Sequence, residues 1–151
     1  MAPAEMEKRL SSMGAEQSPS LTGRWTGVYF YPVDPELNPD DTMPATPFMA
    51  ELTEVSGIIT GVTQERDMFS GADAPPISAT LDGQYFDGEL VFTKTPHGGG
   101  QIHTIDYMGA VSADGNAIAG RWIIYGVWSG VFRMQRSVVA TTQKQTQEQI
   151  A

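Results

Sequence analysis

The segment from Leu21 to Arg136 is a succession of short apolar stretches separated by glycine, proline and aspartate turns. The stretches are rich in β-branched and aromatic residues, and none of the connections holds a helix of ten or more residues. We predict eight strands, at residues 22–31, 48–55, 58–65, 77–86, 89–94, 101–111, 116–124 and 128–136. Eight antiparallel strands joined by hairpins can close into a barrel that has no free edge. The predicted fold is therefore all-β, an eight-stranded antiparallel up-and-down (meander) β-barrel.

Residues 77–94 contain two Asp-Gly pairs, each of which could turn a hairpin. Closure at Asp87-Gly88 places Leu81 and Tyr85 on one face together with Leu90 and Phe92. Closure at Asp82-Gly83 mixes polar and apolar residues on both faces, so the later turn is predicted. Gly83 then lies inside a strand, where we expect it to mark a bulge or a sharp bend.

The remaining segments are predicted to be loops and tails. Residues 1–20 form a flexible N-terminal tail, 21–136 the barrel domain and 137–151 a polar C-terminal tail. The loop 32–47 holds five prolines and four acidic residues, too many prolines for a strand. It is either a lid over one end of the barrel or a passive connection, and the sequence leaves both open.

The net charge of −9 and the lack of cysteine exclude several functions. An acidic protein is repelled by nucleic acid and by anionic membranes, so neither is expected as a partner. Without cysteine there is no disulfide, thiolate metal site or cysteine nucleophile. The N-terminus has no apolar run of signal-peptide length, and no stretch of eighteen apolar residues occurs, which predicts a cytoplasmic location.

The first predicted strand carries a family signature. Leu21 to Phe30, LTGRWTGVYF, contains Gly23-Arg24-Trp25 and resembles the opening strand of avidins and streptavidin and, more loosely, of lipocalins. These families belong to the calycin group of barrels. The resemblance implies a streptavidin-like barrel in which a basic residue of the last strand packs across Trp25; Arg136 is the better candidate and Arg133 the other. Residues 106–109, 120–124 and 130–132 are similar to later parts of the streptavidin pattern.

Two departures from this pattern concern biotin. The resemblance implies that an asparagine and an aspartate would hold the biotin ureido group, at positions occupied here by Gly27 and Gly130. Glycine has no side chain to make those hydrogen bonds, and an apolar pocket alone discriminates weakly. We expect no tight binding of biotin.

Alternation along the strands predicts an aromatic interior. Trp25, Gly27, Tyr29 and Tyr31 share the inward phase, and the last hairpin adds Trp122 and Trp128. Tyr29, Tyr31, Trp122 and Trp128 are therefore candidate ligand-binding residues for a small, partly apolar molecule. Alternatively, these side chains simply fill the barrel as core, as happens in many small barrels.

An enzyme would need an acid or base in the cavity. His103 with a carboxylate such as Glu51 is the candidate catalytic pair, whereas His97 belongs to a glycine-rich loop. No metal site is predicted, because two histidines are too few for zinc and Asp34, Glu36, Asp40 and Asp41 lack the spacing of a calcium loop. No cofactor is predicted.

Apolar residues in the outward phase point to association between barrels. Val28, Phe30, Val91, Ile123 and Val131 face outward on several strands, which predicts a homodimer or homotetramer. Arg121 and Arg133 are expected on the same outer face, paired with Glu51, Glu54 or Glu89. The sequence thus favours a non-catalytic small-ligand-binding barrel; the alternatives are an enzyme using the cavity and a structural self-association module with a filled barrel.

Overall fold

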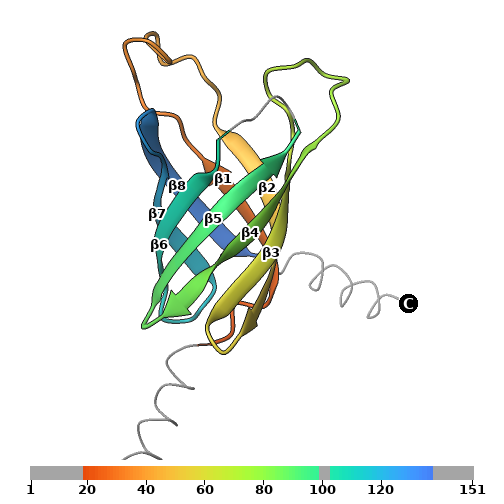
Figure 1. The fold of residues 1–151 in the computed structure, drawn as a ribbon, viewed down its shortest axis with the longest axis vertical. Coiled ribbons are helices and arrows are strands. Elements are labelled where there is room, and N and C mark those ends of the chain that lie inside the picture. The colour runs from red at the N-terminus through yellow and green to blue at the C-terminus, as the bar shows by residue number, and fades with distance from the viewer. Residues whose placement is uncertain (1–18, 99–102, 138–151) are drawn as a thin grey trace, which may run out of the picture.

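The computed structural model describes residues 19–98 and 103–137, which form a closed β-barrel (Figure 1). Its strands are β1 (Gly23–Tyr29), β2 (Thr46–Val55), β3 (Ile58–Glu65), β4 (Ile77–Phe86), β5 (Glu89–His97), β6 (Ile105–Val111), β7 (Ala117–Ile124) and β8 (Trp128–Arg136). Consecutive strands are antiparallel neighbours, and β8 pairs with β1. The prediction of an all-β, eight-stranded up-and-down barrel is confirmed.

The barrel closes because β1 pairs on both of its sides. Trp25 lies opposite Ala50 of β2 and opposite Arg136 of β8. The Ser137 backbone N–H continues this seam by donating to the Arg24 carbonyl at 2.8 Å. A closed sheet has no strand edge on which another chain could add a strand.

Inward side chains fill most of the barrel. In β2, for example, Phe48, Ala50 and Leu52 are buried while Met49 between them is exposed. The largest apolar side chains that are almost fully buried are Trp25, Phe132, Leu21, Ile59, Leu81, Leu90, Ile118 and Met134. Burying a side chain of this size contributes about 1.5–3 kcal/mol, so this core is the main source of stability.

Two of the predicted turns have the backbone that a tight hairpin requires. Ser56 and Gly57 have φ of 51° and 82°, and Asp87 and Gly88 have φ of 53° and 78°. Positive φ at both central residues matches the right-handed twist of the flanking strands. The choice of Asp87-Gly88 over the earlier Asp-Gly pair is confirmed, with Leu81, Tyr85, Leu90 and Phe92 all buried.

Of the two features expected at Gly83, a bulge or a sharp bend, the bulge is absent. Pairing between β4 and β5 runs without interruption from Ser78–His97 to Phe86–Glu89. Gly83 lies opposite Phe92, and a Cβ atom built on it would overlap the Val91 carbonyl oxygen. The glycine is needed because the two backbones approach closely, not because an extra residue is inserted.

Some predicted boundaries move. β5 extends to His97 rather than ending at residue 94, and β6 begins at Ile105 rather than 101, with 99–102 outside the described residues. Most of both predicted tails, residues 1–18 and 138–151, also lies outside them. Ser20 was expected in the tail, but its carbonyl accepts a 2.7 Å hydrogen bond from Arg136 and so belongs with the barrel.

One end of the barrel is closed by Arg136 and Trp25. The guanidinium carbon lies 4.7 Å from the centroid of the indole ring, as predicted for Arg136. The same guanidinium donates to the carbonyls of Ser20, Thr22 and Gly115 and to the Asn116 side chain. The Trp25 indole N–H donates to the Leu21 carbonyl at 2.9 Å. These contacts seal the end at which β1 begins.

The opposite end carries the long connections. The loop from β1 to β2 and the loop from β3 to β4 project from the same end of the barrel (Figure 1). In an up-and-down barrel the C-terminal ends of β5 and β7 also lie at this end, because strand direction alternates. We call it the open end. Among the described residues, no helix has the length and apolar character to cross a membrane.

Candidate functional site

A cavity of about 200 Å³ lies at the open end of the barrel. We call it the open-end pocket, and its lining residues are Tyr29, Tyr31, Met43, Phe69, Lys94, Ile105, Tyr107, Trp122, Ile124 and Trp128. All four residues predicted to bind a ligand, Tyr29, Tyr31, Trp122 and Trp128, are in this set. The barrel is therefore filled toward the Trp25 end and hollow at the other.

The predicted aromatic residues form a connected wall. The rings of Tyr31 and Trp128 stack, with centroids 5.1 Å apart and planes at 28°. Trp122 meets both rings edge to face, at 5.9 Å from Tyr31 and 5.6 Å from Trp128. The Trp122 indole N–H donates to the Phe30 carbonyl at 3.0 Å, which fixes that ring. Such edge-to-face and offset pairs are the favoured arrangements of aromatic rings.

A buried ion pair lies beside this wall. Lys94 Nζ is 2.5 Å from Glu65 Oε1, and the two residues are only 5% and 6% exposed. The Tyr29 hydroxyl donates to the other Glu65 oxygen, and Lys94 Nζ lies 5.0 Å from the centroid of the Tyr29 ring. Removing both charges from water costs several kcal/mol per ion, which the pair offsets only through close contact and further hydrogen bonds.

Three phenols around the pair resist ionisation. Burial raises the pKa of Tyr29 far above its ordinary value, and the negative charge of Glu65 adds to the effect. Burial likewise raises the pKa of Tyr107, again with help from Glu65. Burial raises the pKa of Tyr31 as well. All three hydroxyls therefore keep their protons, and can donate hydrogen bonds, throughout the neutral range.

The two long loops contribute Met43 and Phe69 to the pocket. Asn38 fixes the first loop, because its buried side-chain oxygen accepts from the backbone N–H groups of Thr42 and Met43. Asp67 fixes the second loop by accepting from the N–H groups of Phe69 and Ser70. Hydrogen bonds from Ser70 and Phe69 hold the pKa of Asp67 below its ordinary value. The loop 32–47 is thus an ordered part of the rim.

Aromatic rings occupy the space beside the two glycines that replace the expected biotin-binding residues. A Cβ atom on Gly27 would overlap the Phe48 ring and lie 2.8 Å from the Arg133 carbonyl oxygen. A Cβ atom on Gly130 would overlap the Phe30 carbonyl oxygen and lie 2.6 Å from the Trp122 indole nitrogen. A polar side chain at either position needs neighbouring groups to move.

The candidate catalytic pair is not in the cavity. Glu51 points outward from β2, with its side chain 63% exposed, and pairs with Arg24 at 3.2 Å. His103 precedes β6 and is exposed. Neither residue lines the open-end pocket, so the structure gives this pair no shared site inside the barrel.

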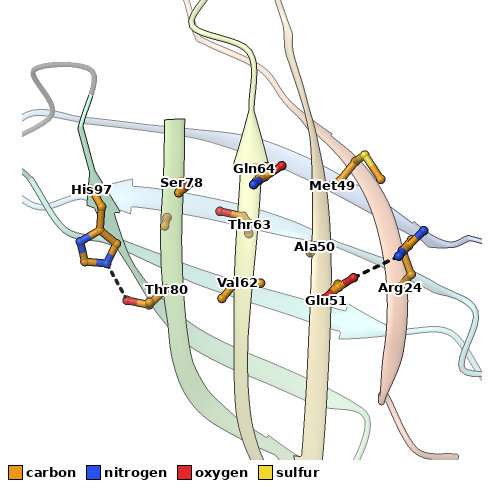
Figure 2. Close-up of a pocket in the computed structure, with 11 residues that line it drawn as sticks. Arg24, Met49, Ala50, Glu51, Val62, Thr63, Gln64, Ser78, Thr80 and His97 are labelled. Carbon is orange, nitrogen blue, oxygen red and sulfur yellow. Dashed lines mark hydrogen bonds and ion pairs between the residues drawn. The ribbon is translucent and has the colours of Figure 1, made fainter. Parts of the chain in front are cut away.

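A larger hollow of about 470 Å³ lies on the outer face of β1 to β5 (Figure 2). Arg24 and Glu51 form one side of it, and His97, 3.2 Å from Thr80, forms the other. Val62, Gln64 and Ser78 separate the two sides in Figure 2. Because His97 and Glu51 each face a different partner across this shallow surface, they form no acid–base pair.

The expected surface ion pairs also differ from the prediction. Arg121 donates to the Ser129 hydroxyl at 2.9 Å, and Arg133 lies over the Phe30 ring at 5.4 Å. Among residues 19–98 and 103–137 the ion pairs are Arg24–Glu51 and Lys94–Glu65. Within the same residues no group of three His, Cys, Asp or Glu side chains could hold a metal.

Sequence reasoning missed Glu65, Lys94 and Tyr107. A signal was present, because Glu65 shares the inward phase of β3 with Ile59 and Thr63. Lys94 shares the inward phase of β5 with Leu90 and Phe92 in the same way. Two opposite charges in the inward phase, each at the open end of its strand, indicate an internal ion pair.

Comparison of the sequence with models of protein families gives no match, and comparison with curated proteins gives none either.

Proposed function

We propose that this protein is a non-catalytic binding protein for a small, partly apolar molecule other than biotin, held in the open-end pocket. The observation that carries the proposal is the aromatic wall of Tyr31, Trp122 and Trp128 beside the buried Lys94–Glu65 pair. Apolar walls with a few converging polar groups are typical of small-molecule sites.

A filled barrel accounts less well for this arrangement. A core that served stability alone gains nothing from a buried ion pair, because apolar residues of the same volume are often as stable or more so. The closed end has such a core around Leu21 and Trp25, which are both 0% exposed. Hollow space, aromatic rings and charge coincide at the other end.

The likeness to avidins remains part of the proposal. It is supported by the barrel topology and by Arg136 packing on Trp25. The crowding at Gly27 and Gly130 supports a ligand other than biotin.

Native mass spectrometry of freshly purified protein tests the proposal. We expect a co-purified small molecule that is displaced by added aromatic compounds and retained poorly by Trp128→Ser. Tyr125→Ser is the matched control, because Tyr125 is in the same hairpin but 72% exposed and outside the pocket. A protein that carries no small molecule and binds no aromatic probe, or equal loss in both variants, would contradict the proposal.

Association between barrels is a second proposal, supported by one row of outer residues. The row crosses four neighbouring strands, from β5 to β8, and consists of Val91, Met108, Arg121 and Val131 in register. The three apolar residues of the row are 45–50% exposed. Apolar groups in register across β5, β6 and β8 suit a homo-oligomer contact. Light scattering at micromolar concentration should give a dimer or tetramer that Met108→Lys dissociates; a monomeric wild-type protein would contradict this.

A further inference from the structure

The polar groups that face the open-end pocket are hydrogen-bond donors. Its polar lining side chains are those of one lysine, three tyrosines and two tryptophans. Ammonium and indole groups can only donate, and a phenol can donate or accept. No carboxylate, amide or imidazole is among the described residues of the lining. Trp122, Tyr29 and Tyr31 already donate within the protein. The donors of Lys94 and Tyr107 suit a ligand that accepts hydrogen bonds.

The one nearby carboxylate is outside the pocket lining, and both of its oxygens accept a hydrogen bond from the protein. Glu65 is absent from the lining, whereas Lys94 is part of it. One Glu65 oxygen accepts from Lys94 and the other from Tyr29. The ammonium group has three N–H donors, so its contact with Glu65 leaves others that can serve a ligand.

Tyr107 supplies a second donor. Its side chain is 3% exposed and belongs to the pocket lining. A phenol in a pocket wall can donate a hydrogen bond to a ligand acceptor or to a water. Because burial raises its pKa, this phenol remains protonated and able to donate.

Charge decides between a neutral ligand and an ion. The charges of Lys94 and Glu65 cancel, so a bound anion would add an uncompensated buried negative charge to a protein of net charge −9. A bound cation would lie beside the Lys94 ammonium. A neutral acceptor such as a carbonyl oxygen avoids both costs.

The volume of the pocket suits a single small ring. A cavity of about 150 Å³ accepts benzene, so the 200 Å³ of this pocket suits a benzene-sized ring with a short substituent. The exposed part of the Tyr31–Trp128–Trp122 wall offers ring faces and edges against which such a ring can pack.

We infer that the ligand of the open-end pocket is a neutral, single-ring aromatic or conjugated molecule that carries a carbonyl group. The carbonyl oxygen accepts from Lys94 and Tyr107, and the ring packs on Tyr31 and Trp128. This inference rests on the proposed binding function and specifies its ligand class.

Calorimetric titration with four probes of equal non-hydrogen atom count tests the inference: acetophenone, isopropylbenzene, benzoate and benzamidinium. Acetophenone is expected to bind at least about tenfold more tightly than each of the others, because a hydrogen bond from a charged donor contributes about 1.5–3 kcal/mol. Isopropylbenzene binding as tightly as acetophenone, or either ion binding more tightly, would overturn the ligand class while leaving the binding function intact. Failure of all four probes to bind would instead contradict the binding function itself.

A charge-free double variant, Lys94→Met with Glu65→Gln, links the preference to the ion pair. It removes the donor without leaving an unpaired charge, so the barrel is expected to remain folded. In this variant the ratio of acetophenone affinity to isopropylbenzene affinity should fall toward one. The surface double variant Arg24→Met with Glu51→Gln removes the exposed pair and should keep the preference. Retention of the preference in the Lys94–Glu65 double variant would overturn the role of Lys94.

Discussion

Lys94 of β5 and Glu65 of β3 form an ion pair inside the barrel, 2.5 Å apart, with both side chains almost completely shielded from water. Two strands that are not neighbours in the sheet are thereby joined across the interior. The Tyr29 hydroxyl, from β1, completes the cluster on the second Glu65 oxygen. This arrangement gives the open end both a polar lining and a fixed shape.

Removing one partner of the ion pair should destabilise the protein, whereas replacing both partners with uncharged residues should leave its stability nearly unchanged. Lys94→Met alone leaves a buried carboxylate unpaired and should lower the free energy of unfolding by about 3–5 kcal/mol. Adding Glu65→Gln should recover most of that loss, because the second charge disappears too. Urea denaturation of the single and double variants measures both effects.

The exposed pair Arg24–Glu51 is the control for the Lys94 and Glu65 variants. Its side chains are 55% and 63% exposed, so Arg24→Met should cost only about 0–1 kcal/mol. Equal losses of unfolding free energy in Lys94→Met and Arg24→Met would contradict the larger contribution expected of the buried pair.

Arg136 should be the basic residue on which the closed end depends. Arg136→Met removes the cation–π contact with Trp25 and the hydrogen bonds to three carbonyls, a loss of about 2–4 kcal/mol in unfolding free energy. Arg133→Met, which removes the exposed contact with Phe30, should cost about 1 kcal/mol or less. Thermal and urea unfolding distinguish the two, and the reverse order would refute the assignment of Arg136.

Stability should fall steeply in alkaline solution. The raised pKa values of Tyr29 and Tyr107 mean that the folded protein keeps these protons while the unfolded chain loses them near the ordinary phenol value of 10.0. The stabilisation is complete below that pH and is lost above it, by about 1.4 kcal/mol per pH unit for each phenol.

Tyr107→Phe isolates one phenol. The variant should unfold with a shallower pH dependence than the wild type above pH 10, because one titrating group has been removed. Unfolding free energies from pH 8 to pH 11 provide the measurement. Identical slopes for variant and wild type would mean that Tyr107 ionises equally in both states.

Gly27 should tolerate no side chain. Gly27→Ala brings a Cβ atom against the Phe48 ring and the Arg133 carbonyl, an overpacking that should cost about 1–3 kcal/mol. Gly27→Asn should therefore fail to create biotin binding in isothermal titration. Gly71→Ala is the control, because a Cβ atom there has no neighbour within 4 Å and only the positive φ of 99° opposes the substitution. Gly115→Ala would not serve, because its Cβ atom would lie close to Pro19. Submicromolar biotin affinity in the wild type or in Gly27→Asn would contradict our interpretation.

The strand order and much of the register could be predicted because they depend on local patterns. Alternation and turn chemistry identified β3, β4 and β8 to the residue, and the inward phase of β1 identified Tyr29 and Tyr31. The Arg136–Trp25 contact followed from a family resemblance.

Features that depend on distant parts of the chain were not predicted. Met43 and Phe69 reach the pocket from loops whose paths are fixed by hydrogen bonds to Asn38 and Asp67. The alternation of polar and apolar residues does not predict the path of a loop. His103 was expected inside a strand that begins at residue 101, but the strand begins at Ile105 and His103 is exposed. The bulge expected at Gly83 was wrong because close backbone approach and a bulge both select glycine.

The three tryptophans offer the most direct test of where a ligand binds. Trp122 and Trp128 line the open-end pocket, whereas Trp25 lies under Arg136 at the closed end and is 0% exposed. In an NMR titration with acetophenone, observed through the three indole N–H resonances, we predict large shifts for Trp122 and Trp128 and none for Trp25. Unchanged resonances for Trp122 and Trp128, or an equal shift of all three, would contradict a binding site at the open end of the barrel.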